Sequence, residues 1–160
     1  PKSPKTPLDW VYKAVGKKDI RDYLHTAWIC PEGNLVASDG HRLHIVGGYT
    51  SKGEHTPIDS QGTLTEADNY SRAFADYKKV LGDNNILEYK PLDSIPRGYS
   101  SSTEYGKVVQ TVVVDGTHTL NLNYWEDAMA GLTNPLVALK DNKVIIKEGS
   151  KTAVIMCMSA

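Results

Sequence analysis

The stretch VASDGHRLHIV (36–46) decides the fold, because two short apolar runs flank an Asp-Gly pair. Asp39 and Gly40 suit a two-residue hairpin turn, in which both residues need a positive φ angle. The sequence therefore predicts a β-hairpin, with strands over 34–38 and 42–46. A histidine and an arginine follow the turn at once, and they either belong to a site or only border the hairpin.

Outward from the hairpin, two segments have helical spacing of their apolar residues. The segment 6–16 predicts a helix that Thr6 can cap, and 120–132 predicts a second helix that Asn121 or Asn123 can cap. The buried stripe of the first helix would be Leu8, Val11 and Val15. The buried stripe of the second helix would be Leu122, Trp125, Met129 and Leu132.

The rest of the chain predicts antiparallel strands and one long connection. Alternating apolar and polar residues predict a strand over 20–30, directly before the hairpin. Further β-branched runs, separated by turn formers, predict strands over 107–114, 135–140, 143–148 and 151–158. Between them, 47–105 is rich in turn formers, and the segment 92–106 is predicted to be an exposed loop.

The order of these elements indicates the fold class. A helix, strands, a long connection, a strand, a helix and more strands predict an α+β fold, with two helices on one face of antiparallel sheet. The two halves are roughly similar, since each is a helix followed by a meander. We expect one domain over 1–160, with 1–5 as a flexible tail and 47–105 as an elaborated connection.

Charge and hydropathy limit the possible functions. A formal net charge of −1 gives no overall basic field, so any contact with nucleic acid must use a local patch. No apolar run approaches the roughly 20 residues of a membrane span, and no secretory signal is visible. Cys30 and Cys157 lie far apart in apolar segments, which favours buried thiols over a disulfide and predicts a cytoplasmic location.

No motif of a catalytic or metal site stands out. His41 and His44 are three residues apart, so on a strand they would point to opposite faces and would not share a metal ion. The segment 148–152 (EGSKT) lacks the Gly-Lys order of a phosphate loop. We expect no cofactor, no metal and no enzymatic activity, although a hydrolase that uses the loop 96–106 stays open as an alternative.

Several segments resemble one known family. The segment DIRDYLHTAWICPEGNLVASDGHRLHIV (19–46) resembles the middle domain of the bacterial sliding clamp, the beta subunit of DNA polymerase III. That domain has an arginine-tyrosine-leucine strand and then a hairpin that reads alanine-threonine-aspartate-glycine-histidine-arginine-leucine. Shorter segments resemble the join between two clamp domains, the last clamp helix and the C-terminal strand: FADYKKVL (74–81), LNLNYWEDAMAGL (120–132) and AVIMCM (153–158).

The resemblance implies a groove that receives a short linear peptide from a polymerase or another replication protein. Carried over residue by residue, its lining would be Arg21, Tyr23, Leu24, Ser38, Gly40, His41, Arg42, Leu43, Ala75, Val80, Val154, Met156 and Met158. Apolar residues and adaptable methionines would anchor the peptide, and the polar residues would hydrogen-bond to it. For each apolar residue, the alternative is that it only fills the core.

The resemblance also implies double-stranded DNA as a partner, held by its backbone without sequence specificity. Clamp helices line a central hole with basic residues, and the first helix and its exit supply Lys13, Lys17 and Lys18 here. The second helix instead supplies Glu126 and Asp127, which oppose phosphate binding. A clamp ring contains six such domains, so a chain with about one domain would have to form a homo-oligomer.

We therefore expect a clamp-like processivity factor that forms a ring on DNA and tethers a polymerase through its peptide. The alternative is a clamp-like binding module without a ring, which captures or competes for replication proteins. Ala75 and Cys157 stand where the clamp family has prolines. These replacements affect the predicted peptide groove less than the acidic second helix affects the predicted DNA channel. The small size suggests a phage or mobile element as the source.

Overall fold

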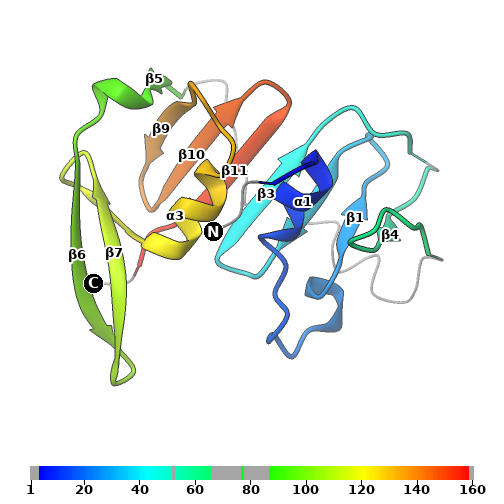
Figure 1. The fold of residues 1–160 in the computed structure, drawn as a ribbon, viewed down its shortest axis with the longest axis horizontal. Coiled ribbons are helices and arrows are strands. Elements are labelled where there is room, and N and C mark those ends of the chain that lie inside the picture. Colours follow the sequence, from blue (N-terminus) through cyan, green and yellow to red (C-terminus); the bar gives the residue numbers. More distant parts are fainter. Residues whose placement is uncertain (1–3, 52, 66–76, 78–86, 159–160) are drawn as a thin grey trace.

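The computed structural model describes residues 4–51, 53–65, 77 and 87–158, and it consists mostly of antiparallel sheet with few helices (Figure 1). This confirms the coarse fold that the sequence predicts. Ala75, Val80 and most of the segment 69–83 lie outside the described residues. Among the described helices, none is long and apolar enough to cross a membrane.

The first helix, α1 (Pro7–Tyr12), begins as predicted but ends early. The Thr6 hydroxyl accepts a hydrogen bond from the Asp9 N–H at 3.1 Å, which satisfies one of the free donors at the helix start. Beyond Tyr12, the N–H groups of Ala14 and Val15 bond to carbonyls only three residues back. The chain therefore tightens into 3₁₀-type turns, and the expected helix over 6–16 is too long.

The predicted strand over 20–30 is only partly a strand. A 3₁₀ turn occupies Asp22–Leu24, and β1 covers Ala27–Ile29. The turn is held by the Trp28 indole N–H, which donates to the Tyr23 carbonyl at 2.8 Å. The alternating apolar residues therefore belong to a compact turn and a short strand. Period-two spacing alone does not distinguish this arrangement from one long strand.

The predicted hairpin forms from β2 (Leu35–Ser38) and β3 (Arg42–Val46), but its turn is wider than expected. Ser38 pairs with Leu43, so four residues lie between this last pair of the hairpin, and of these only Gly40 has a positive φ, of 91°. The Asp39 carboxylate accepts from the N–H groups of His41 and Arg42 at 2.8 and 3.1 Å. This aspartate-capped turn replaces the two-residue turn that the sequence predicted.

The second half follows the predicted order. It contains β7 (Lys107–Val114), β8 (His118–Asn121), α3 (Leu122–Met129), β9 (Leu136–Lys140), β10 (Lys143–Glu148) and β11 (Lys151–Met156). Asn121 caps α3, because its side-chain oxygen accepts from the N–H groups of Asn123 and Tyr124. The short β8, which ends at this cap residue, was not predicted as a strand.

The connection 47–105 contains more regular structure than the sequence predicted. It includes β4 (Thr56–Ile58), β5 (Lys90–Pro91), a 3₁₀ turn over Leu92–Ser94 and β6 (Arg97–Glu104). The segment 92–106, predicted to be an exposed loop, is exposed over 97–104 but is not a loop there, because β6 pairs with β7 along its whole length. Tyr105 and Gly106 have φ angles of 51° and 78°, which fits a two-residue hairpin turn between the strands.

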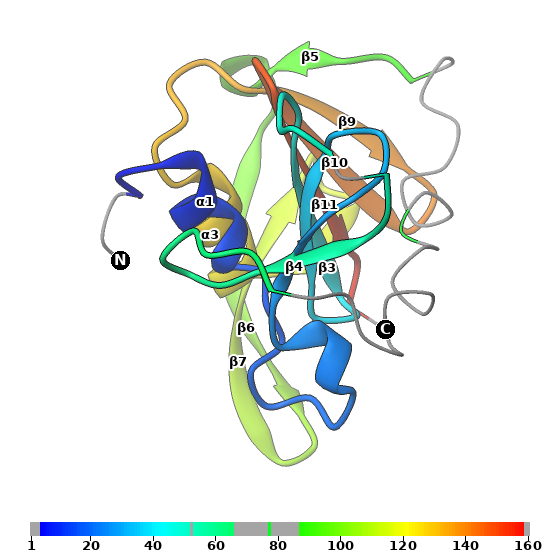
Figure 2. The same ribbon diagram turned by 90° about the vertical axis from the view of Figure 1, so that its right-hand side faces the viewer.

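One continuous sheet joins the two halves. Its strand order is β4-β1-β2-β3-β11-β10-β9-β5, while β6, β7 and β8 form a second sheet. The join is the antiparallel pair of β3 and β11, in which Val154 faces Leu43. Both helices cover the same face of the large sheet (Figure 2). Each half thus contains a helix followed by a three-stranded meander, β1–β2–β3 in the first half and β9–β10–β11 in the second. The last strands of these meanders, β3 and β11, pair with each other.

The large sheet separates two apolar cores. The larger core lies on the helix side and includes Trp10 and Val11 of α1, Trp125 of α3, and residues of β7 and β8. The Trp10 indole N–H donates to the Ala128 carbonyl at 3.0 Å, which ties α1 to the end of α3. The smaller core lies on the other face and consists of Leu24, Trp28, Cys30, Val36, Leu43, Ile45, Tyr77, Ala138, Ile145 and Val154.

Candidate functional site

Alternation along β3 divides the predicted groove residues between the two faces of the sheet. His44 belongs to the helix side, since its ring stacks on Trp10 at 4.2 Å between centroids, and Arg42 reaches the same side to contact α3. Leu43 faces the smaller core. Because neighbouring side chains on a strand point to opposite faces, Arg42 and Leu43 do not line one surface.

Arg42 is held by acidic and aromatic partners from both halves. Its guanidinium contacts the Asp39 carboxylate at 3.0 Å and the Asp127 carboxylate of α3 at 2.6 Å. It also lies over the Tyr124 ring, 4.4 Å from the centroid. With its side chain only 9% exposed, Arg42 is a structural link between the hairpin and α3.

The apolar groove residues of β3, β11 and the Asp22–Leu24 turn come together in the smaller core. Leu24, Leu43 and Val154 are all buried there, and Tyr23 packs at its edge. Tyr77 belongs to the same core and shows that the middle of the chain reaches it. These residues fill the core, the alternative that the sequence left open for each of them.

The hairpin turn and the residues before β1 form a separate polar contact. Arg21 makes a two-point ion pair with Asp19 at 3.0 Å, and this guanidinium holds the pKa of the Asp19 carboxyl well below its usual range. A Cβ on Gly40 would lie 2.6 Å from Arg21 Nη2, so the end of this arginine side chain would have to shift to make room for it. Ser38 donates to the Arg42 carbonyl at 2.7 Å and is part of the turn.

A pocket of about 410 Å³ gathers His41, Met156 and Met158 of the predicted groove. Its other walls come from the β6–β7 turn, the start of α3 and the end of β11: Glu104, Tyr105, Asn121, Tyr124 and Cys157. Its walls are tied together, because the Met156 N–H donates to the His41 carbonyl at 3.0 Å and the Met158 N–H donates to the Thr119 carbonyl at 2.9 Å. We call this the end pocket.

Tyr124 gives the end pocket a polar wall. Burial, and then the nearby Asp39 carboxylate, raises the pKa of the Tyr124 hydroxyl, so the group stays neutral. The His41 ring lies nearly parallel to the Tyr124 ring, with 6.4 Å between centroids. The pocket thus combines two methionines, aromatic faces, polar groups and the Glu104 carboxylate, which suits a partly apolar peptide segment.

A second, more open pocket of about 650 Å³ lies on the helix side of the hairpin turn. It contains all three predicted DNA-contact residues, Lys13, Lys17 and Lys18, and it shares His41 and Tyr124 with the end pocket. Its carboxylates are engaged by Arg21 and Arg42, and in the described part of the chain no ion pair joins a carboxylate to the three lysines. We call this the lysine pocket.

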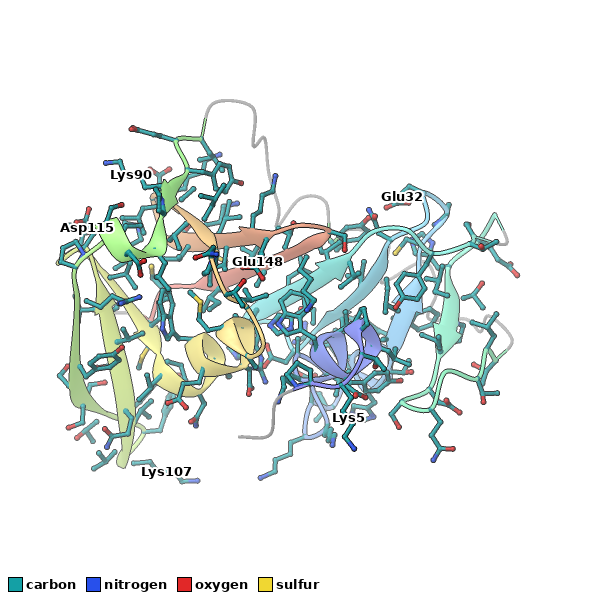
Figure 3. The ribbon with its side chains drawn as sticks, turned by 45° about the horizontal axis from the view of Figure 1, so that its top comes forward. Lys5, Glu32, Lys90, Lys107, Asp115 and Glu148 are labelled. Atoms are coloured by element: carbon teal, nitrogen blue, oxygen red, sulfur yellow. The ribbon has the colours of Figure 1, made fainter. Side chains whose placement is uncertain are left out.

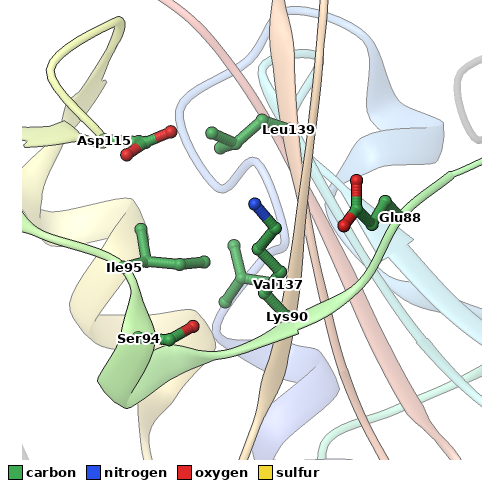
Figure 4. Close-up of a pocket in the computed structure, with 7 residues that line it drawn as sticks. All are labelled: Glu88, Lys90, Ser94, Ile95, Asp115, Val137 and Leu139. Carbon is green, nitrogen blue, oxygen red and sulfur yellow. The ribbon is translucent and has the colours of Figure 1, made fainter.

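A third pocket, of about 170 Å³, lies at the far edge of the large sheet and contains no predicted site residue (Figure 4). Lys90 points into it from β5, and Val137 and Leu139 form its apolar floor. Elsewhere, the described residues hold no cluster of histidine, cysteine and acidic side chains that could bind a metal ion. No disulfide joins Cys30 and Cys157, and burial raises the pKa of the Cys157 thiol.

Sequence reasoning missed five residues of the end pocket: Glu104, Tyr105, Asn121, Tyr124 and Cys157. The first two fall in the segment predicted as a loop, the next two fall in the predicted helix, and Cys157 was predicted only as a buried thiol. The missed signal was Tyr-Gly between two eight-residue strands, since glycine readily takes the positive φ of such a turn. No sequence pattern showed that this turn reaches the end of β11.

Known proteins resemble this chain in structure but not detectably in sequence. No protein-family model matches it, and no curated protein matches its sequence. A DNA polymerase sliding clamp from Pseudomonas aeruginosa has a TM-score of 0.61 and 13% identity, covering 99% of this chain and 66% of the clamp. A Helicobacter pylori beta clamp bound to a DNA ligase peptide has a TM-score of 0.64 and 12% identity, covering 99% of this chain and 64% of the clamp.

A further Helicobacter pylori beta clamp, in complex with a difluorobenzamide, has a TM-score of 0.67 and 10% identity over 96% of this chain. The chain therefore has a sliding-clamp-like fold. It spans about two thirds of the length of each of these clamps, or 63% in the last case.

Proposed function

We propose that this protein is a sliding-clamp-like factor of DNA replication, which holds short linear peptides of a polymerase or another replication protein in the end pocket. The observation that carries the proposal is the joining of His41, Met156 and Met158 with the aromatic rings of Tyr105 and Tyr124 around one cavity. One solved neighbour is a beta clamp bound to a DNA ligase peptide, which supports the same mode of action.

Peptide binding needs no chemical step by the protein. The methionines offer flexible, polarisable contacts that adapt to different side chains, and the aromatic rings add flat apolar area. The asparagine and histidine at the pocket can bond to peptide amides. Because the walls are already tied by backbone hydrogen bonds, little ordering is required when a peptide enters.

The finer proposal is that several copies encircle double-stranded DNA, with the lysine pocket facing the phosphates. The net charge of −1 gives the chain no overall attraction for phosphate. Local cations at the lysine pocket come from Lys13, Lys17 and Lys18. Such contacts carry no sequence information, so they allow sliding along the duplex. A peptide held at the same time would keep its polymerase at high local concentration.

The alternative is a clamp-like peptide-binding module that forms no ring on DNA. One feature of α3 favours it, since Glu126 is exposed on this helix and Asp127 is only half-buried. Acidic groups beside the lysine pocket weaken phosphate binding. This module would capture or compete for replication proteins through the same end pocket.

Titration of a labelled peptide tests the proposal that both versions share. A short peptide containing Gln and Leu should bind the native protein, and Met156→Ala should weaken the binding about tenfold or more, because it removes apolar contact area. Leu136→Ala is the matched control, since Leu136 is an exposed apolar residue on β9 outside the end pocket. Absence of binding to the native protein, or equal affinities for the two variants, would contradict the proposal.

Retention on DNA separates the ring from the module. A ring should stay on circular plasmid and come off after linearisation, and Lys17→Glu should lower retention without changing the peptide titration. Lys107→Glu makes the same charge change at the β6–β7 turn and should leave retention unchanged. Release that is equally fast from circular and linear DNA would support the module instead.

A further inference from the structure

The sheet edges of this molecule are not equally protected against pairing with another strand. β4 has three residues and includes Pro57, and β5 consists only of Lys90 and Pro91. Short length, proline and lysine are the usual ways in which a natural edge avoids a new partner. The outer strand of the second sheet, β6, has eight residues with the sequence RGYSSSTE, and it contains neither proline nor lysine.

The backbone of β6 presents a regular row of hydrogen-bonding groups outward. Glu104 and Lys107 close the two-residue turn, so the backbone of Glu104 faces β7. Because these groups alternate along an antiparallel strand, Tyr99, Ser101 and Thr103 direct theirs away from β7. In the described part of the chain, no strand pairs with this outer edge.

Exposed apolar side chains gather on the same hairpin. Six large apolar residues are exposed among the described residues, and three of them, Tyr99, Tyr105 and Val108, lie on β6, on β7 or in their turn. The hairpin extends beyond the body of the molecule, with Lys107 near its free end (Figure 3). β8 pairs only with residues 111–114 of β7, so the outer part of the hairpin is two-stranded, and a further strand would stabilise it.

We propose that the outer edge of β6 pairs with β6 of a second copy of this chain, antiparallel and centred on Ser101. In this arrangement Tyr99 of one copy faces Thr103 of the other, and Val108 follows in the same row on the same face, because Val108 pairs with Thr103. Aromatic and β-branched residues form favourable cross-strand pairs. The side chains of β6 are thus complementary to those of β6 in a second copy.

Charge also favours a second copy in the antiparallel direction. Arg97 and Glu104 stand at opposite ends of β6. An antiparallel pair therefore brings Arg97 of each copy to the end that carries Glu104 of the other, and like charges never face each other. A parallel pair would instead place like charges together. The contact is two-fold, so by itself it ends at two chains, and it does not depend on the proposed peptide function.

The solution mass tests this pairing, using a proline at Ser101. The native protein should reach about twice the 17.6 kDa mass of one chain as its concentration rises, by analytical ultracentrifugation. Ser101→Pro removes an outward N–H from each copy without touching the bonds to β7, and it should weaken association at least about tenfold. Ser101→Ala keeps the N–H and is the matched control.

Two outcomes would overturn the pairing: a native protein that stays monomeric at every concentration, or a proline variant that associates as tightly as Ser101→Ala. Circular dichroism should show native-like folding for both variants. The peptide titration of Ser101→Pro should match that of the native protein, so a failed pairing and a failed peptide function give different results.

Discussion

The Arg42 guanidinium lies between the Asp39 and Asp127 carboxylates and over the Tyr124 ring. The resemblance to clamps placed it at the rim of a peptide groove, where its guanidinium would hydrogen-bond to the peptide. The structure instead uses it to neutralise two acids that come from different halves of the fold. Removal of one partner from such a shielded network leaves the others uncompensated.

Arg42→Ala should therefore lower the free energy of unfolding by about 2 to 4 kcal/mol. Urea denaturation followed by circular dichroism measures this change. Arg21→Ala is the control, because its ion pair with Asp19 is solvent-exposed and should contribute much less. If the two variants lose the same stability, Arg42 does not link the halves.

His44 gives the protein a defined dependence of stability on pH. Burial lowers its pKa to about 3, although its hydrogen bond to the Trp10 carbonyl partly opposes this effect. The unfolded chain has the ordinary histidine pKa of about 6.5 and so binds a proton first as the pH falls. The stability that neutral His44 contributes is complete above that pH and is lost progressively toward the folded-state pKa.

Between pH 7 and pH 5, this group should reduce the free energy of unfolding by about 2 kcal/mol. Denaturant titrations at both pH values measure the loss. In His44→Gln the loss over this interval should be smaller by the same amount, whatever the absolute stability of the variant. An equal loss in both proteins would show that His44 is not the titrating group.

At the scale of elements, the hairpin β2–β3 depends on the conformation of Gly40. Its φ of 91° disfavours any residue with a Cβ, and the Arg21 guanidinium occupies the space beside it. Gly40→Ala should cost about 1 to 2 kcal/mol of stability, measured by thermal unfolding. Gly98→Ala on β6 should be nearly neutral, since no atom lies near its added Cβ and no positive φ is needed; equal losses would contradict this account.

The strong elements could be predicted from the sequence, and the contacts that build the site could not. β7, β10 and β11 contain β-branched runs, and α3 has a cap and an apolar stripe, so local chemistry defined them. β6 was missed because its serine-rich sequence has little strand propensity, and its pairing with β7 overrides that preference. Strand pairing joins residues that are distant in the sequence, so it produces no periodic pattern in the sequence of either strand.

The candidate site was predictable only where a residue's position followed from the hairpin or the tail strand. Met156 and His41 meet because β3 and β11 pair, which the resemblance to clamps implied. Leu43 and Val154 also meet, but they do so inside the core, since strand alternation turns them away from the end pocket. Residue type alone does not separate a buried anchor from a core side chain.

At the scale of the whole molecule, the join between the two halves positions the walls of the end pocket and of the lysine pocket. β3 pairs with β11, Trp10 bonds to the end of α3, and Arg42 bridges to Asp127, so the hairpin turn and α3 are fixed relative to each other. The end pocket and the lysine pocket lie on either side of this join and share His41 and Tyr124. The arrangement therefore places the proposed peptide site next to the lysine pocket in one small fold.

The most direct test of this account is an NMR map of where a short Gln- and Leu-containing peptide binds the native protein. The amide signals of His41, Tyr105, Asn121, Tyr124 and Met156 through Met158 should shift together as peptide is added. Signals of β4 and of the third pocket should not move. Shifts confined to those distant regions, or no shifts at all, would contradict the claim that the end pocket receives the peptide.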